Sequence, residues 1–464
     1  MTEEVIYEVP AHDIYRLVFP RGRFIKQLED DLTIFIQLIE RLSGLEKEVF
    51  KATFDKNYAK FSSSADKTIA NHRTEMITLF GLTRYEGDLV FLSNSAQVLL
   101  ETQDFPLFFK SLTNNFQFPN LINKWTTAVS QAELRINFKP AQFILRLLKL
   151  AEDKYSGHIF YVSGQEISNL VFNDIRVAKG ERSVDDVLAT LISAREAGIS
   201  LPVGSNMSQH GREFLHYMTL ANLLKLDESE RNFCLNHNEK KSIDHIIQDR
   251  SYVSFKKDLT NSEVIADIKD AWERKFKTIS TEEINVFKRT AKTIQLDIPS
   301  LQKDDKNKAV LTPHQSSLNE TGDEGERYVL KYEKELVGKQ RPDKLGLVAR
   351  VANDTSLGYD IQSLELPDCN KKKYIEVKST IRTFPPSEVV LTYFPMSGNE
   401  WETARHYQDS YYIYRVVLLG DEVTTYVVQN PVKKYEEGKI FLDVKEYRVT
   451  LKHDAVDSVY SVER

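Results

Sequence analysis

The segment KKKYIEVKST carries two charged side chains in a pattern that could do chemistry. Side chains of a β-strand alternate between its two faces, so Tyr374, Glu376 and Lys378 share one face. Ile375 and Val377 point the other way, toward a core. A carboxylate beside an amine on one strand is either a plain ion pair or half of a metal-dependent active site, and the rest of the chain has to separate these alternatives.

A second carboxylate, Asp360, lies in the segment LGYDIQSL, where the glycine and tyrosine predict a tight turn into a strand. Fifteen residues lie between Asp360 and Glu376, enough for one strand, a turn and a second strand. Adjacent strands are about 4.8 Å apart, so both carboxylates can converge on one divalent cation. Mg²⁺ takes oxygen ligands and keeps several waters, so these two groups and the backbone carbonyl of Val377 would suffice. Lys378 would then position the attacking water or stabilise charge on phosphorus.

The segment GDEGERYVLKYEKELV at residues 322–337 predicts a helix that opens the last domain. Glu326 falls near its core face and is expected to point toward the sheet. The apolar side of this helix is expected to hold Tyr328, Val329, Tyr332 and Leu336.

Five segments between residues 322 and 420 follow one another in a characteristic order: GERYVLKYEKEL, LGYDIQSL, YIEVKST, FPMSGNEWETA and YYIYRVV. This series resembles the No Vein-type C-terminal domain family, which belongs to the PD-(D/E)XK nuclease-like superfamily. The resemblance implies that Asp360, Glu376 and Lys378 form the catalytic core. It implies that Glu326 adds an acidic group from the first helix, for a second metal.

The same resemblance places the SGNEW segment, with Ser397, Asn399 and Glu400, at the start of a helix beside the sheet and near DNA. One feature departs from the superfamily pattern, because no proline precedes Asp360. Gly358 and Tyr359 are expected to form the turn instead.

The N-terminal two-thirds repeats a helix followed by a short strand–turn–strand. In the first copy Asp66 is expected to cap a helix that Gly81 ends, and Ser93 to cap the helix after a hairpin. The second copy runs from NFKPAQFIL to the strand NFCLN and the helix after it. Such units in series resemble the winged-helix recognition arms of Type II, and specifically Type IIS-like, restriction endonucleases, which implies double-stranded DNA as the substrate.

Two groups of side chains are candidates for DNA contact in this region. Lys67, Asn71 and Arg73 lie early on the first winged-unit helix, where they either reach a groove or form a solvated face. The loop RVAKGERS offers three cations to phosphates, or simply keeps the surface soluble. These cations are Arg176, Lys179 and Arg182.

The composition bounds the class of protein. Net charge is −6, which does not suit a general nucleic-acid coat but allows a local basic face. Cys234 and Cys369 match no metal spacing, and their small number fits a reducing cytoplasm. The N-terminus lacks the pattern of a signal peptide, and no apolar run is long enough for a membrane span. The chain has no G-x-x-x-x-G-K-[ST] motif, so no nucleotide partner is expected.

The sequence therefore predicts an α+β multi-domain protein with N-terminal, mainly α, winged-helix-like units and a C-terminal α/β restriction-endonuclease-like domain with a mixed central sheet. The expected function is sequence-specific, Mg²⁺-dependent cleavage of double-stranded DNA in a bacterial restriction system. A homodimer, a partner subunit or two sequential nicks would cut both strands. The expected boundaries are a first recognition unit at 1–125, a second at 126–250, a helical segment and polar linker at 251–319, and the nuclease domain at 320–464.

Two other readings stay open. In one, the N-terminal half reads methylated or otherwise modified DNA, and the nuclease chemistry is unchanged. In the other, the C-terminal domain is catalytically inactive and the chain is a DNA-binding regulator.

Overall fold

The computed structural model describes residues 25–442 apart from short internal gaps. The polar linker expected between the halves lies partly outside the described residues, because the gaps include residues 289–312. The side chains of residues 206–209 and 313–320 are also not described. The gaps are residues 60–65, 156–158, 200, 202–205, 228, 256–257, 289–312, 353, 355, 368–369, 387–393, 421 and 441.

The first N-terminal unit has the predicted helix followed by a hairpin. Helix α3 ends as expected before Gly81, whose φ of +59° suits a residue without a side chain. The Ser93 hydroxyl accepts a hydrogen bond from the Ala96 backbone N–H and so caps the next helix. A three-stranded antiparallel sheet of order β1-β3-β2 lies among the helices. The elements are α1 (Ile25–Arg41), β1 (Leu45–Glu46), α2 (Lys47–Tyr58), α3 (Asp66–Leu79), β2 (Thr83–Glu86), β3 (Leu89–Leu92), α4 (Asn94–Thr102) and α5 (Phe105–Asn115).

The second unit also combines helices with a three-stranded antiparallel sheet, of order β4-β6-β5. The predicted strand NFCLN is confirmed as β6, and the expected helix follows it. The elements are α6 (Trp125–Glu133), α7 (Pro140–Lys154), β4 (Val162–Ser163), α8 (Gly164–Ile167), the π-helical turn Ser168–Phe172, α9 (Ile175–Lys179), α10 (Val184–Glu196), α11 (Asn206–Leu220), β5 (Leu224–Leu226), β6 (Asn232–Leu235), the 3₁₀ turn His237–Glu239 and α12 (Lys240–Gln248).

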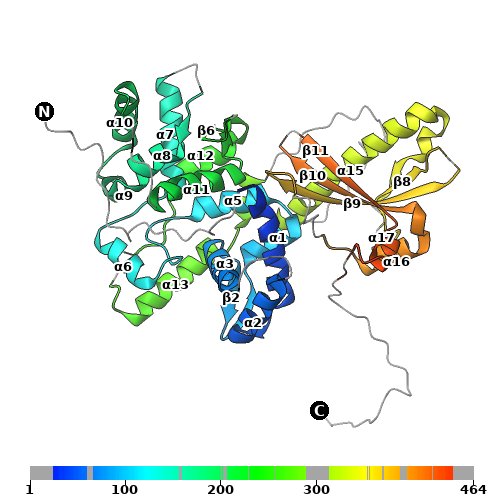
Figure 1. The fold of residues 1–464 in the computed structure, drawn as a ribbon, viewed down its shortest axis with the longest axis horizontal. Coiled ribbons are helices and arrows are strands. Elements are labelled where there is room, and N and C mark those ends of the chain that lie inside the picture. Colours follow the sequence, from blue (N-terminus) through cyan, green and yellow to red (C-terminus); the bar gives the residue numbers. More distant parts are fainter. Residues whose placement is uncertain are drawn as a thin grey trace, which may run out of the picture.

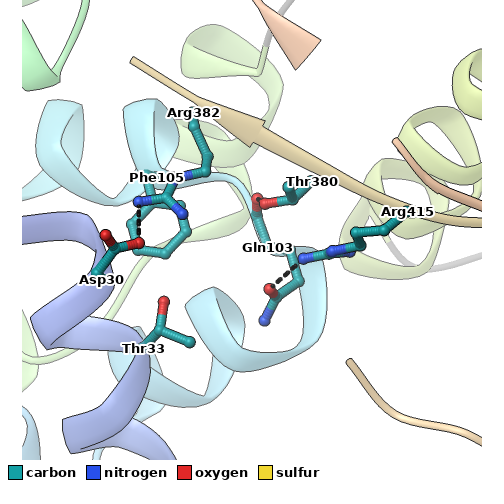
Figure 2. Close-up of a pocket in the computed structure, with 7 residues that line it drawn as sticks. All are labelled: Asp30, Thr33, Gln103, Phe105, Thr380, Arg382 and Arg415. Atoms are coloured by element: carbon teal, nitrogen blue, oxygen red, sulfur yellow. Dashed lines mark hydrogen bonds and ion pairs between the residues drawn. The ribbon is translucent and has the colours of Figure 1, made fainter. Parts of the chain in front are cut away.

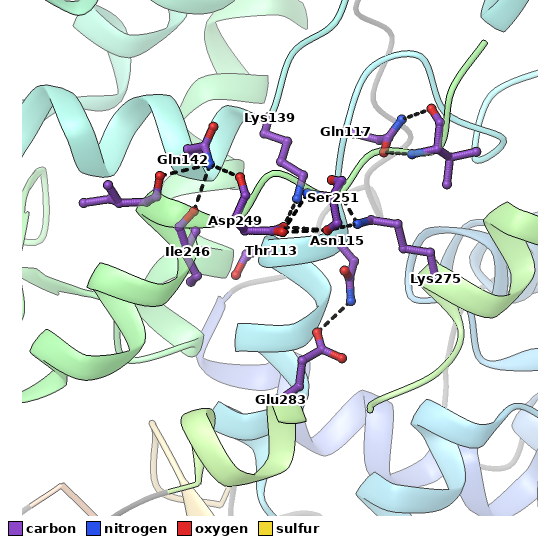
Figure 3. Close-up of polar contacts among 12 residues, drawn as sticks. Thr113, Asn115, Gln117, Lys139, Gln142, Ile246, Asp249, Ser251, Lys275 and Glu283 are labelled. Atoms are coloured by element: carbon purple, nitrogen blue, oxygen red, sulfur yellow. Dashed lines mark hydrogen bonds and ion pairs between the residues drawn. The ribbon is translucent and has the colours of Figure 1, made fainter. Parts of the chain in front are cut away.

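The segment after α12 forms two helices, α13 (Ser262–Phe276) and α14 (Thr281–Phe287), which pack back on both units. A single hydrophobic core runs from α1 to α14. Buried polar bonds add to it: Asn115 donates to Glu283 at 2.8 Å, and Lys139 pairs with Asp249 (Figure 3). The N-terminal elements therefore form one packed body, and the unit boundaries within it stay predictions.

The C-terminal region is built on one mixed five-stranded sheet of order β11-β10-β9-β8-β7. Strands β9 and β10 are parallel and the other neighbours are antiparallel. The predicted mixed central sheet is confirmed. Its elements are α15 (Pro313–Gln340), the 3₁₀ turn Pro342–Leu347, β7 (Ala349–Arg350), β8 (Ile361–Leu364), β9 (Lys372–Arg382), α16 (Gly398–Tyr407), the 3₁₀ turn Gln408–Ser410, β10 (Tyr411–Leu419), β11 (Glu422–Gln429) and α17 (Pro431–Glu436).

Helices cover both faces of this sheet, as Figure 1 shows. Helix α15 supplies Val329, Leu330 and Val337 to the core on one face. Helix α16 supplies Ala404 to a smaller core on the other face, beside Tyr359. The sheet is therefore buried on both sides around β9 and β10.

Helix α15 differs from its prediction in two ways. It begins at Pro313, so part of the segment expected to be a linker is helical. Tyr332, expected on the apolar side, is exposed, whereas Glu333 faces the core with no exposed surface. The Glu333 carboxylate accepts hydrogen bonds from Lys373, Ser363 and Tyr414, and this full set of partners explains how a charge lies in the core.

The sheet also joins the N-terminal body directly. Ile381 of β9 donates its backbone N–H to the Gln103 carbonyl at 2.9 Å, and Arg382 pairs with Glu29 and Asp30 of α1. Arg415 donates to the side chain of Gln103 (Figure 2). None of the helices in the described residues is both long and apolar enough to cross a membrane.

Candidate active site

Strand β9 shows the predicted alternation. Ile375 and Val377 lie in the core beneath α15, and Tyr374 packs in the core beneath α16. Glu376 and Lys378 share the α16 side with Tyr374. Glu376 is almost fully buried, so its charge is not an ordinary surface charge.

The turn before β8 presents Asp360. Gly358 has a φ of +69°, and a side chain there would collide with Thr403 of α16. The Tyr411 hydroxyl donates to the Gly358 carbonyl at 2.9 Å. The glycine is needed both for the backbone conformation and for the close approach of α16.

Asp360 is bound to β9 by two backbone contacts. Its N–H donates to the Ile375 carbonyl at 2.9 Å, and its carboxylate accepts from the Val377 N–H at 2.8 Å. The N–H and C=O of one strand residue point to the same strand edge, so the Val377 carbonyl faces the edge at which Asp360 lies. These contacts hold Asp360 beside the part of β9 that carries Glu376. The convergence of the two carboxylates on one cation stays a prediction.

Lys378 lies between two carboxylates. Its Nζ is 2.7 Å from Glu376 Oε1 and 3.0 Å from Glu400 Oε2. Burial opposes the ammonium, but the two carboxylates outweigh it and raise the pKa of Lys378 above its ordinary value. Lys378 is therefore a cation at neutral pH.

Glu326 lies on α15, facing the sheet as predicted. It pairs with Arg350 of β7, which also binds Asp323. Burial and the charge of Asp360 raise the pKa of Glu326 to about 7, although Arg350 opposes this shift. Glu326 is thus within electrostatic reach of Asp360 and adjusts the charge of the site.

The carboxylates of the site repel one another in a desolvated space. Burial raises the pKa of Glu376 to about 8, with Asp360 and Glu400 adding to the shift and Lys378 opposing it. Burial also raises the pKa of Asp360. Burial makes these carboxyl groups costly to ionise, so a bound cation would stabilise their ionised forms by compensating the negative charge.

The donor set fits a hard divalent cation in part. Asp360, Glu376 and the Val377 carbonyl offer oxygen ligands, and Mg²⁺ usually completes its shell with water. Among the described residues, no group of three or more histidine, cysteine, aspartate or glutamate side chains already lies in a metal-binding arrangement. The fit therefore rests on two carboxylates, one carbonyl and water.

Comparison with known proteins finds separate matches for the N-terminal and C-terminal regions of the chain. A family model described as "Restriction endonuclease BpuJI - N terminal" matches residues 7–293, more than half of the chain. The chain belongs to this BpuJI N-terminal family. A solved structure agrees: the BpuJ1 endonuclease binding domain, in complex with pyrene- and phenanthrene-modified DNA, is 25% identical with a TM-score of 0.50. The match covers 58% of this chain and 100% of that one.

The C-terminal region has a different relative. The family model "Protein NO VEIN, C-terminal" matches residues 325–428, which confirms the resemblance inferred from the five ordered segments. Protein NO VEIN of Arabidopsis thaliana is 30% identical over 131 residues, 28% of this chain. The chain spans only 4% of the length of that relative.

Within the BpuJI-type region, the candidate DNA-contact residues of α3 differ in availability. Lys67 and Asn71 are exposed. Arg73 is largely buried and pairs with Asp55 at 2.7 Å, so it holds α3 to α2. Contact of these residues with DNA stays a prediction, and Lys67 and Asn71 are the better placed.

The segment expected to be a basic loop is partly helical, because Arg176 and Lys179 lie in α9 and only Arg182 follows it. Its cations are also internally paired. Arg176 and Arg182 both bind the buried carboxylate of Asp174, at 2.9 and 2.7 Å. The Nζ atom of Lys179 lies 4.0 Å from Oε1 of Glu181. These bonds shape the end of α9 and the turn after it, and contact of the three cations with phosphates stays a prediction.

Ser397 and Asn399 have structural partners at the start of α16. Ser397 forms a capping box with Glu400, and Asn399 donates to the Ser356 carbonyl at 3.2 Å. The bond from Asn399 connects α16 to the turn that presents Asp360. Their contact with DNA is also untested.

Sequence reasoning left Arg350 out of the site and gave Glu400 no chemical role. The S-x-x-E spacing at residues 397–400 does signal a capping box. No local signal places Glu400 beside Lys378, because the two residues meet only through the packing of α16 on the sheet.

Proposed function

We propose that this protein is a Mg²⁺-dependent endonuclease that recognises a specific sequence in double-stranded DNA and hydrolyses its phosphodiester bonds. The observation that carries this proposal is that Asp360 is bonded to β9 at Val377, between Glu376 and Lys378, which pair with each other on one face of that strand. This set is the D…E-x-K pattern of the PD-(D/E)XK nucleases, and a plain ion pair would not need the third member.

The match of the N-terminal body to a known protein indicates the substrate in this proposal. It matches the binding domain of a restriction endonuclease along the whole length of that domain, and the matched structure is a DNA complex. We therefore assign sequence recognition to the BpuJI-type region and cleavage to the C-terminal sheet, in the manner of a Type II enzyme of bacterial restriction.

Each residue of the cleavage site has a distinct task. Asp360, Glu376 and the Val377 carbonyl would hold Mg²⁺, which supplies Lewis acidity and lowers the pKa of a bound water. Lys378 keeps its proton and therefore acts as a cation that stabilises negative charge on the phosphate, not as a base. Glu326 adds negative charge from α15, and α16 excludes water from one side.

The part of the chain that the structure describes holds one such set, so cutting both strands would need a homodimer, a partner subunit or two sequential nicks. The products of plasmid cleavage distinguish these routes. An early accumulation of nicked circles indicates sequential nicks, whereas direct appearance of linear DNA, with a rate that rises steeply with protein concentration, indicates a dimer.

The decisive experiment is Mg²⁺-dependent cleavage of unmodified plasmid and phage DNA, with the Asp360→Ala variant alongside. Discrete fragments from the native protein alone support the proposal, and sequencing their ends gives the site. Cleavage of methylated DNA only would transfer the assignment to a modification-dependent enzyme. Equal cutting by both proteins, or DNA binding without cutting on any substrate, would overturn it.

A further inference from the structure

Glu400 is the carboxylate of this site that has no assigned task. It comes from α16, whereas the other members come from α15, β9 and the turn before β8. Its Oε2 lies 3.0 Å from Lys378 Nζ, and Lys378 is only 16% exposed. This is a partly desolvated ion pair between two elements, so it has more energetic weight than a surface pair.

The position of Glu400 is itself fixed. Its carboxylate accepts the backbone N–H of Ser397 at 2.9 Å, and its own N–H donates to the Ser397 hydroxyl at 3.2 Å. The start of α16 is in turn bonded to the turn before Asp360 through Asn399 and Thr403. A side chain held in this way can orient its partner.

Lys378 needs such a second partner if Glu376 binds a cation. In the structure Glu376 Oε1 is its nearer partner, at 2.7 Å. A divalent cation on Glu376 would compete for that carboxylate and repel the ammonium, because both are positive. A lysine with Glu376 as its single partner would then leave the site.

We propose that Glu400 is a positioning residue of the cleavage site, which holds Lys378 beside the reacting phosphate when Glu376 turns to the metal. This inference rests on the proposed nuclease function. Glu400 itself touches neither substrate nor metal and acts through Lys378.

The substitution Glu400→Gln tests this inference with little damage to the helix. Glutamine can still accept the Ser397 N–H in a capping box, but it carries no charge. The matched control is Glu402→Gln on the same helix, because Glu402 is exposed and pairs only with Arg405 among the contacts described. We expect Glu400→Gln to lower kcat for DNA cleavage about 10- to 100-fold, as loss of an orienting partner does, and Glu402→Gln to leave it unchanged.

The dependence on substrate and metal separates positioning from ligation. We expect KM for DNA and the half-saturating Mg²⁺ concentration to stay at their native values in Glu400→Gln. A variant that needs more Mg²⁺ and recovers full kcat at high Mg²⁺ would overturn the inference, because Glu400 would then be a metal ligand. Unchanged kcat would overturn it as well.

A second measurement does not depend on cleavage. Thermal unfolding of metal-free protein is compared for Glu400→Gln in the native background and in Lys378→Met. We expect Glu400→Gln to lower Tm by more in the native background than in Lys378→Met, because the ion pair exists only in the former. Equal shifts would mean that Glu400 serves only the helix cap and would overturn the inference. Absence of cleavage by the native protein would instead count against the proposed function, whatever the unfolding experiment gives.

Discussion

Lys378 lies between two carboxylates, and this surrounding determines its charge. A buried amine without a carboxylate partner could lose its proton and act as a base. Glu376 and Glu400 instead favour the ammonium form. The chemistry expected of Lys378 is therefore electrostatic, and removing it should affect the transition state more than the binding of DNA.

The substitution Lys378→Ala should lower the rate of cleavage about 10²- to 10³-fold, as loss of one group that stabilises transition-state charge does. Affinity for target DNA should stay close to native, measured by fluorescence anisotropy without metal. Lys331→Ala, an exposed change on α15, is the control and should cleave normally. A large loss of affinity with unchanged kcat would contradict this role.

The buried carboxyl group of Glu376 predicts how the stability of the protein depends on pH. Its pKa is about 8 in the folded protein and near its ordinary value of 4.5 after unfolding. The folded state binds the extra proton between these values, so the free energy of unfolding should fall as pH rises from about 4.5 to 8. Glu376→Gln should remove part of this fall. The free energy of unfolding of the variant, minus that of the native protein, should therefore rise by about 2–4 kcal/mol between pH 4.5 and pH 8.

Urea unfolding at several pH values, without metal, measures this effect. Glu335→Gln, exposed on α15, should show the native pH dependence. At pH 8, added Mg²⁺ should stabilise the native protein more than at pH 5.5, because protons compete with the metal, and should not stabilise Glu376→Gln. Parallel pH curves for the native protein and Glu376→Gln would show that Glu376 ionises normally.

The elements hold the site through close packing as well as through bonds. Helix α15 crosses β9 at Gly325, where a Cβ atom would lie 1.9 Å from the Ser379 hydroxyl and 3.1 Å from its Cβ. The glycine lets the helix come near enough to place Glu326 over the sheet. The hydroxyl oxygen of Ser379 is buried and has no hydrogen-bond partner among the described residues.

Gly325→Ala should therefore destabilise the protein by about 1–3 kcal/mol, as overpacking does, and should slow cleavage by displacing α15 from β9. Gly322→Ala, one turn earlier, meets nothing closer than 3.9 Å and should be tolerated. The double variant Gly325→Ala/Ser379→Ala should recover part of the loss, because the nearest colliding atom is removed. Chemical denaturation of the four proteins checks this, and a stable Gly325→Ala would show that the crossing is looser than described.

At the scale of the whole molecule, one strand serves both the proposed cleavage site and the junction between the halves. Residues 376–378 of β9 lie in the site, and Ile381 and Arg382 are bonded to the N-terminal body. The guanidinium of Arg382 meets Glu29 and Asp30 with almost no exposure to water. Figure 2 shows its contact with Asp30. Burial raises the pKa of Glu29, and Arg382 opposes this shift.

Arg382→Ala should thus leave two buried carboxylates without their cation and destabilise the protein by about 3–5 kcal/mol. Lys154→Ala, which breaks an exposed pair with Asp185, should cost less than about 1 kcal/mol. Thermal unfolding with limited proteolysis would show the loss and whether the two halves then unfold separately. A change as small as that of Lys154→Ala would mean that the junction is held by other contacts.

The sequence by itself determined the features that depend on near neighbours along the chain. The period of two in KKKYIEVKST set the faces of β9, Gly81 ended α3 and Ser93 capped α4. The polar composition near residue 313 concealed the start of α15, because a helical segment of polar residues has no apolar stripe to reveal it.

The tertiary structure alone decided the contacts between residues far apart in sequence. Glu400 meets Lys378 because α16 packs on the sheet, and Arg382 meets Glu29 because β9 extends into the N-terminal body. It also paired Arg73 and Arg176, two candidates for DNA contact, with the carboxylates of Asp55 and Asp174. Charge and spacing show which groups a chain offers, but the choice of partner for each group is made by the packing of elements, since a buried charge is stable only beside its counter-charge.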